Sequence, residues 1–209
     1  MNKKKTITAA VVLMLVLLVG GLVAYFTDTD EKTNTFTVGN VDIEVLEPGW
    51  DALTDTDGDK IPDDAEDMMP GETVAKDPKI HNKSTTNPAY VFAKVESPCT
   101  TGATPLELFD YTNDPQVNSG WTLMTDGTCT NGKITRIYAY GSSSAMTELA
   151  ADGNTPTLFD TLTLNTAFDG TNKPSDTDVK ITGYAVQTTG LNISQATPNA
   201  VWGAAGFTN

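Results

Sequence analysis

The sequence contains a single histidine, His81, among its 209 residues. A zinc site of the HExxH type needs two histidines, and the chain has no recognisable nucleophile elbow for a Ser-His-Asp relay. His81 lies in the polar stretch 79–83, where a surface or interstrand histidine is the simpler interpretation. The sequence also lacks the glycine-rich loops that bind nucleotide phosphates. It therefore predicts a protein that is not an enzyme.

Basic side chains are scarce as well. The chain has 13 Lys and Arg against 27 Asp and Glu, which gives a formal net charge of −14. Residues 3–5 are three of the lysines, so a chain processed after them has 10 bases, 27 acids and a charge of −17. Such a surface repels nucleic-acid phosphates and anionic membranes, which excludes a nucleic-acid partner. It attracts cations instead.

Only two cysteines are present, Cys99 and Cys129. In an exported protein an even number indicates a disulfide, and closing a loop of about 31 residues would stabilise the fold by roughly 3–4 kcal/mol. Two reduced, buried thiols are the alternative. A zinc site is not expected, because the single histidine and two cysteines make a poor ligand set.

Long hydrophobic runs are confined to the N-terminus. Lysines at 3–5 precede an uncharged apolar segment at 7–19, and small residues end the run near Ala24. This is the pattern of a secretory signal peptide, and we expect cleavage between Ala24 and Tyr25. The alternative is an uncleaved anchor over residues 6–26, which is just long enough to span a bilayer. We expect an exported protein with no stable membrane anchor after processing.

The composition favours strands, with 34 Thr against 8 Glu. In residues 89–95, for example, Tyr90 and Phe92 alternate with Val91, Ala93 and Val95. The predicted strands are 35–38, 41–45, 74–76, 79–81, 89–95, 134–140, 158–164 and 179–187. Residues 47–72 and 97–132 are predicted loops, with one helical turn at 105–109, and 194–202 is a short closing helix or strand. The fold class is therefore all-β, a jelly-roll-like β-sandwich with long loops and few short helices.

An acidic loop at 51–67 has the spacing of a calcium site. Over twelve residues, positions 1, 3, 5, 9 and 12 are carboxylates, and position 7 offers a backbone carbonyl. The predicted ligands are Asp55, Asp57, Asp59, Ile61, Asp63 and Glu66. The loop resembles the calcium repeats of EF-hand and thrombospondin type 3 proteins, but Lys60 replaces the usual glycine at position 6. A solvated acidic loop is the alternative to a structural Ca²⁺.

Several segments resemble the TasA/camelysin family of exported proteins, which a SipW-type signal peptidase processes. The similar residues are 24–28, 34–43, 70–83, 89–95, 181–187 and Trp202. The resemblance implies a subunit that polymerises into extracellular fibres of a biofilm matrix. It also implies partners: identical subunits, the signal peptidase and minor matrix subunits. Camelysin has been described as a metallopeptidase, but the single histidine leaves no recognisable zinc site here.

In such fibres the N-terminal segment of one subunit adds a strand to the next subunit. Applied to this chain, the resemblance gives a signal peptide at 1–24, a donor segment at 25–38 and a β-sandwich domain at 39–209. The expected anchoring residues of the donor are Phe26, Phe36 and Val38. An unpaired sheet edge is a template for such an addition, and head-to-tail addition does not close.

Two alternatives to this function remain. In the first, the protein is a calcium-stabilised monomeric surface adhesin or binding module that uses loops 97–132. For residues 34–38 themselves, the alternative to strand donation is that they pair within their own sandwich. The second is a secreted metallopeptidase. In every case the protein is expected to be secreted, in the extracellular matrix or at the cell surface.

Overall fold

The computed structural model describes residues 34–36, 41–109, 117–168, 174 and 177–208, and the first three by their backbone alone. The chain divides after Glu31 into two units, and every described residue belongs to the second, Lys32–Asn209. In the described residues, no helix has the length and apolar character needed to cross a bilayer.

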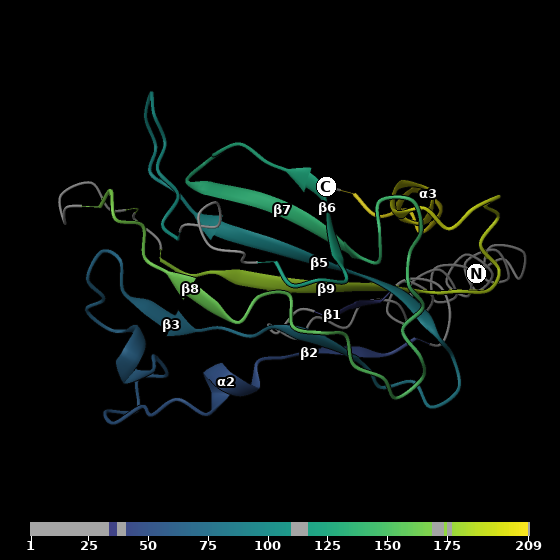
Figure 1. Cartoon of the computed structure of the whole chain (residues 1–209), viewed down its shortest axis with the longest axis horizontal. Coiled ribbons are helices and arrows are strands. Elements are labelled where there is room, and N and C mark those ends of the chain that lie inside the picture. The colour runs from purple at the N-terminus through teal and green to yellow at the C-terminus, as the bar shows by residue number, and fades with distance from the viewer. Residues whose placement is uncertain (1–33, 37–40, 110–116, 169–173, 175–176, 209) are drawn as a thin grey trace, which may run out of the picture. The chain divides into compact units, whose positions relative to one another are not determined.

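A five-stranded sheet forms one layer (Figure 1). Its strands, in spatial order, are β1 (Asn34–Phe36), β9 (Lys180–Gln187), β5 (Ala89–Pro98), β7 (Lys133–Tyr140) and β6 (Trp121–Asp126). The pairs β9–β5, β5–β7 and β7–β6 are antiparallel. The edge pair β1–β9 is parallel. The first described strand of the chain therefore lies at one edge of the sheet, beside the last.

Two smaller sheets form the opposing layer. β2 (Ile43–Leu46) pairs with β4 (Lys79–Asn82), and β3 (Thr73–Ala75) pairs with β8 (Thr161–Thr163), both antiparallel. The described part of the chain also contains the short helical elements α2 (Pro48–Asp51), the 3-10 turn η1 (Asp63–Ala65) and α3 (Pro198–Ala204). The prediction of an all-β fold is confirmed. In the described residues, the strands divide into one sheet of five and two of two, rather than the two four-stranded sheets of a regular jelly roll.

The alternation of side chains along β5 creates two hydrophobic clusters, one on each face of the large sheet. Val91, Ala93 and Val95 pack in the cluster that contains Ile43 and Ile80 of the opposing layer. On the other face, Tyr90 and Phe92 pack with Val201 and Trp202 of α3. The central strand is therefore covered on both faces, and the predicted division of its side chains is confirmed.

Most predicted strands appear within a few residues of their expected ends, but the prediction that residues 97–132 form a loop was partly wrong. The expected helical turn at 105–109 is extended, since Glu107 forms a bridge with Cys99 and Phe109 with Leu164. Arg136 fixes this segment by pairing with Glu107. The same loop region also contains β6, which the threonine-rich sequence obscured. The closing segment forms α3, with Thr197 as its N-cap.

The predicted disulfide between Cys99 and Cys129 is confirmed. Cys99 follows directly after β5, and its Cα lies 6.1 Å from that of Cys129 in the loop after β6. Cys99 is buried, whereas Cys129 is half-buried. The bond therefore joins the end of the central strand to a loop beyond the edge of the sheet.

Tyr138 predicts how stability changes in alkaline solution. Burial on β7 is the main cause that raises its pKa to about 12 from the ordinary value of 10.0. As pH rises, the unfolded chain loses this proton before the folded chain does. The contribution of Tyr138 to the free energy of unfolding is therefore fully present below pH 10 and falls as pH rises toward 12, by about 1.4 kcal/mol per pH unit at most. Tyrosinate absorbance during alkaline titration should show a tyrosine that titrates near pH 12 and is lost in Tyr138→Phe. A profile that the substitution leaves unchanged would contradict this assignment.

Candidate functional site

The edge pair β1–β9 places the start of the domain beside its last strand. Asn34, Thr35 and Phe36 pair in parallel with Gly183, Tyr184 and Ala185. Parallel neighbours that are not joined by a short crossover can come from the same chain or from two chains, because the backbone hydrogen bonds are the same. Glycine at position 183 leaves room for the opposing layer, because a Cβ there would lie only 3.1 Å from the Cδ1 of Ile43.

The structure places part of the predicted donor segment. The backbone of Phe36 lies in β1, opposite Ala185. Phe26, Val38 and the expected cleavage residues Ala24 and Tyr25 lie outside the described residues. Residues 34–36 pair with a strand of their own chain, as in the alternative stated above, but at the edge of the sheet and not at its centre. Sequence reasoning had not identified β9 as the receiving strand, because an edge is a property of the sheet order.

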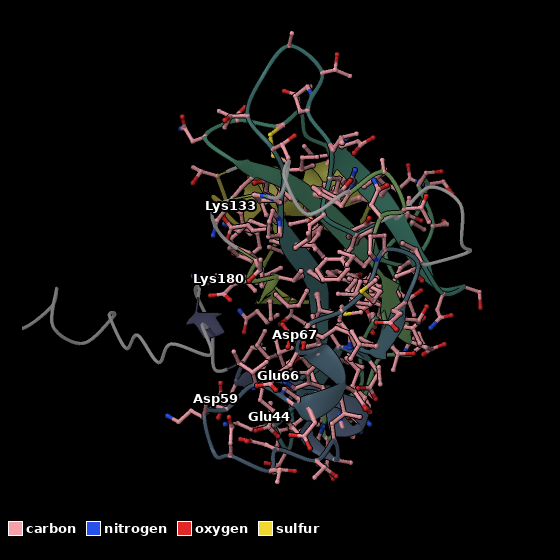
Figure 2. All side chains as sticks on the ribbon, turned by 90° about the vertical axis from the view of Figure 1, so that its left-hand side faces the viewer. Glu44, Asp59, Glu66, Asp67, Lys133 and Lys180 are labelled. Carbon is pink, nitrogen blue, oxygen red and sulfur yellow. A yellow bond between two sulfur atoms is a disulfide. The ribbon has the colours of Figure 1, made fainter. Side chains whose placement is uncertain are left out.

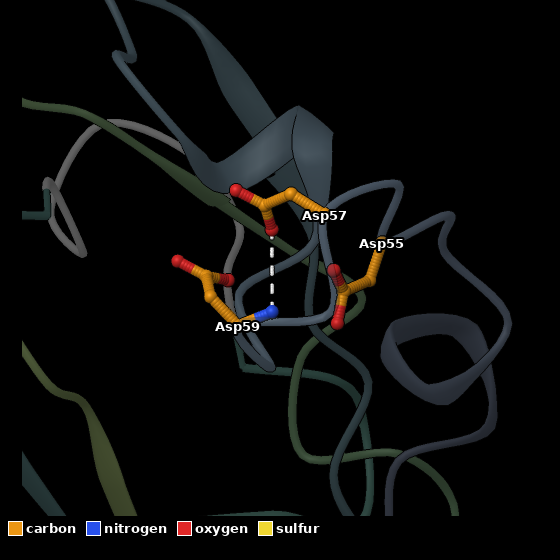
Figure 3. Close-up of side chains that lie close together, drawn as sticks. All are labelled: Asp55, Asp57 and Asp59. Atoms are coloured by element: carbon orange, nitrogen blue, oxygen red, sulfur yellow. Dashed lines mark hydrogen bonds between the residues drawn. The ribbon is translucent and has the colours of Figure 1, made fainter.

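Three of the predicted calcium ligands form a cluster. One carboxylate oxygen from each of Asp55, Asp57 and Asp59 lies within 4.8 Å of the other two (Figure 3). All three side chains are exposed. The backbone N–H of Asp59 donates to Asp57 Oδ1 at 3.2 Å, and Figure 3 shows the side chains of Asp57 and Asp59 on the same side of the loop. The expected convergence of positions 1, 3 and 5 is therefore observed.

The backbone of this loop turns through two residues with positive φ. Gly58 has φ 81° and donates its N–H to Asp55 Oδ1 at 2.6 Å. Lys60 has φ 77° and donates its N–H to Asp55 Oδ2 at 3.0 Å. Lys60 thus adopts the left-handed conformation for which the usual glycine is suited, and a lysine adopts it at a cost in free energy. Asp55 holds the loop closed by accepting both bonds.

The remaining predicted ligands are arranged differently. Asp63 is turned toward Thr56, whose Oγ1 and N–H donate to its two carboxylate oxygens at 2.5 and 2.8 Å. These bonds, the side-chain bond first, lower the pKa of Asp63. Loss of hydration, followed by repulsion from Asp57 and Asp59, raises the pKa of Glu66. Ile61 donates its N–H to Asp59 Oδ1 at 2.8 Å.

Glu66 therefore experiences the negative potential of the cluster without belonging to it. Figure 2 shows Asp59, Glu66 and Asp67 at the same end of the structure. Sequence spacing correctly grouped the carboxylates of the first half of the loop. It missed Thr56 as the partner of Asp63, because a threonine between two aspartates has no distinctive spacing.

Lys76 and Asp77, which directly follow β3, hold the segment before the acidic loop against the sandwich. Lys76, which is buried, binds Glu47 at 2.7 Å, and its Nζ lies 4.2 Å from the centre of the Trp50 ring. Asp77 accepts the N–H groups of Gly49 and Trp50. The sequence shows only an isolated Lys-Asp pair here, so these contacts could not be inferred from it.

His81 has a structural position in β4. Its Nδ1 lies 3.2 Å from the carbonyl oxygen of Gly153, and its Nε2 lies 3.6 Å from Asp152 Oδ1. In the described part of the chain, the one group of carboxylate, cysteine and histidine side chains with metal-binding spacing is the aspartate cluster, which does not include His81. The interpretation of His81 as an interstrand histidine fits this geometry.

Comparison with known families gave a match to the N-terminal part of the chain. The family model described as camelysin metallo-endopeptidase matches residues 2–100. This range includes β1 and the whole acidic loop. Neither a curated protein nor a solved structure matched the chain. The match over residues 2–100 supports the resemblance to the TasA/camelysin family.

Proposed function

We propose that this protein is a secreted structural subunit that polymerises into extracellular matrix fibres by addition of its N-terminal strand to a neighbour. The observation that best supports this is β1, a strand of three residues at the sheet edge. It is the first described strand, so exchanging it between chains leaves the rest of the sandwich intact.

Exchange between chains needs no new contact. A β1 strand from a second subunit forms the same backbone bonds to Gly183, Tyr184 and Ala185 as the strand of the same chain. Each subunit then donates one surface and accepts through another, which is a heterologous contact that grows into a filament. Cleavage between Ala24 and Tyr25 by a signal peptidase would release the donor at export. Electron microscopy of the processed chain tests the proposal, with fibres expected and a monodisperse monomer contradicting it.

The acidic loop is proposed to bind a structural Ca²⁺. Asp55, Asp57 and Asp59 supply hard carboxylate oxygens from a loop closed by its own backbone bonds, which suits the flexible geometry of calcium. The segment directly before the loop, residues 47–50, is joined to the end of β3 through Lys76 and Asp77. A bound cation would therefore stabilise the sandwich beside the loop by reducing the repulsion among its carboxylates.

Calcium is expected to raise the melting temperature of the processed chain, and the double substitution Asp55→Asn with Asp57→Asn should remove that increase. The amides keep the size of the side chains while lowering their charge and affinity for a hard cation. Calorimetry with and without calcium measures the effect. Asp64→Asn is the matched control, since Asp64 lies in the same loop outside the cluster. An increase that persists in the double variant would assign the metal to another site.

The protein is proposed to have no peptidase activity, although its family is named for a metallo-endopeptidase. His81, the single histidine of the sequence, lies in β4, and its Nδ1 contacts the carbonyl oxygen of Gly153. The purified processed chain, supplied with zinc, should hydrolyse an unstructured protein no faster than a buffer blank. Hydrolysis that a chelator stops and that His81→Ala abolishes would contradict the proposal.

A monomeric binding module is the second candidate, because β1 pairs with its own chain here. It predicts that the processed chain remains a monomer at all concentrations, whereas a polymerising subunit does not.

A further inference from the structure

The connection from β9 to α3, residues 188–197, contains the sequence Asn192-Ile193-Ser194 (Figure 1). Asparagine followed two residues later by serine or threonine, with any residue except proline between them, is the acceptor sequence for N-linked glycosylation of exported proteins. The chain has one other copy of this sequence, at 82–84. The two copies are equivalent as sequences, but the fold treats them in opposite ways.

The first copy is closed in the folded chain. Asn82 is fully buried at the end of β4, and its Nδ2 donates to the carbonyl oxygens of Asn87 at 2.9 Å and Ala150 at 3.1 Å. Its Oδ1 accepts the N–H of Ser84 at 3.1 Å, while Ser84 Oγ accepts the N–H of Asn87. Releasing these side chains to an enzyme would leave buried backbone groups unpaired, at a cost in free energy. The folded chain therefore offers no acceptor at Asn82.

The second copy is open. Asn192 and Ser194 are exposed, and within the described part of the chain neither side chain forms a hydrogen bond. Leu191 and Ile193 are half-buried and pack against the hydrophobic cluster beneath α3. Burial thus alternates along the segment, so that its apolar side chains hold it to the domain while the amide and the hydroxyl lie in solvent. These are the two groups that define the acceptor sequence.

We propose that Asn192, and not Asn82, accepts an N-linked oligosaccharide when the chain is exported. The donor is an oligosaccharide carried on a polyprenyl phosphate. The Nδ2 of Asn192 forms a bond to the anomeric carbon of the sugar, the bond from that carbon to the carrier phosphate breaks, and the phosphate leaves with the electron pair. One amide proton passes to the transferase. Ser194 supplies the hydroxyl that the transferase recognises.

This inference rests on the proposed function only for export, and it does not require polymerisation. In the proposed fibre β9 receives β1 at Gly183–Ala185, whereas Asn192 follows the end of that strand at Gln187. The oligosaccharide is therefore compatible with strand addition. On assembled fibres it would mark the connection 188–197 as part of their outer surface.

Tandem mass spectrometry of peptides from the chain isolated outside its own cells tests the site. We expect sugar-derived ions from the peptide that contains Asn192 and none from the peptide that contains Asn82. An unmodified Asn192 in the exported chain, or sugar on Asn82, would overturn the proposal.

Substitutions at Ser194 test whether the acceptor sequence itself directs the modification. Ser194→Ala should abolish the modification although Asn192 remains, and Ser194→Thr should retain it, because threonine also supplies a hydroxyl. Ser119→Ala, at another exposed serine, is the matched control and should leave the sugar in place. Sugar that persists in Ser194→Ala, or that is lost in Ser194→Thr, would overturn the assignment.

Electron microscopy of the same exported material separates this inference from the proposed function. An exported chain that carries the sugar on Asn192 but stays monomeric would support the site and contradict the fibre. Fibres in which Asn192 is unmodified would support the fibre and overturn the site.

Discussion

A processed chain that begins at residue 39 is expected to form no fibres, whereas the chain that begins at Tyr25 is expected to polymerise. The shorter chain lacks β1 and the preceding donor residues, so it keeps the edge at Gly183–Ala185 but has no strand to add to a neighbour. Electron microscopy and sedimentation measure the loss, which is expected to be complete and not partial.

The shorter chain must be folded for this result to be informative. The core clusters described above are built from side chains between 41 and 207, so we expect it to retain a cooperative thermal transition. Added to the longer chain in small amounts, it should shorten fibres, because it accepts a strand at the growing end and offers none. Fibres of normal length formed by the folded shorter chain alone would refute strand donation.

Loss of the disulfide is expected to lower the free energy of unfolding by about 3–4 kcal/mol in the chain-entropy account of a 30-residue separation. The double substitution Cys99→Ala with Cys129→Ala removes the link between β5 and the loop after β6. For a domain of this size, the melting temperature should fall by about 10 °C. Chemical denaturation and calorimetry measure the two quantities.

Reduction of the unmodified chain provides the control. It should produce a similar loss of stability, while the same reductant should leave the double variant unchanged. A loss of less than about 1 kcal/mol would contradict this estimate and show that the contacts of Arg136 with Glu107 and Asp126 hold the segment without the disulfide.

The regular strands were predictable because their side chains alternate or form short apolar runs between turn residues. The central strand at 89–98 and the last strand at 180–187 are the clearest examples. Loop 97–132 was less predictable, because its threonines suit both strands and turns. There the disulfide and the Arg136–Glu107 pair impose extended structure on residues that have a helical pattern, such as Leu106 to Phe109.

The two candidate sites, the acidic loop and the receiving edge on β9, also differed in how far the sequence predicted them. The convergence of Asp55, Asp57 and Asp59 was predictable because alternate residues of one tight loop come together. Lys60 at φ 77° shows that the loop keeps its turn without the usual glycine, which the sequence left open. The receiving edge on β9 was not predictable, because residues 34–36 and 183–185 are far apart in sequence and meet only in the assembled sheet.

High-resolution electron cryomicroscopy of fibres grown from the processed chain would trace the backbone between Phe36 and Val41. We predict that this connection crosses from one molecule to the next, so that the strand lying against Gly183–Ala185 starts in a different polypeptide. A connection that stays within one molecule at every position along the fibre would contradict the account.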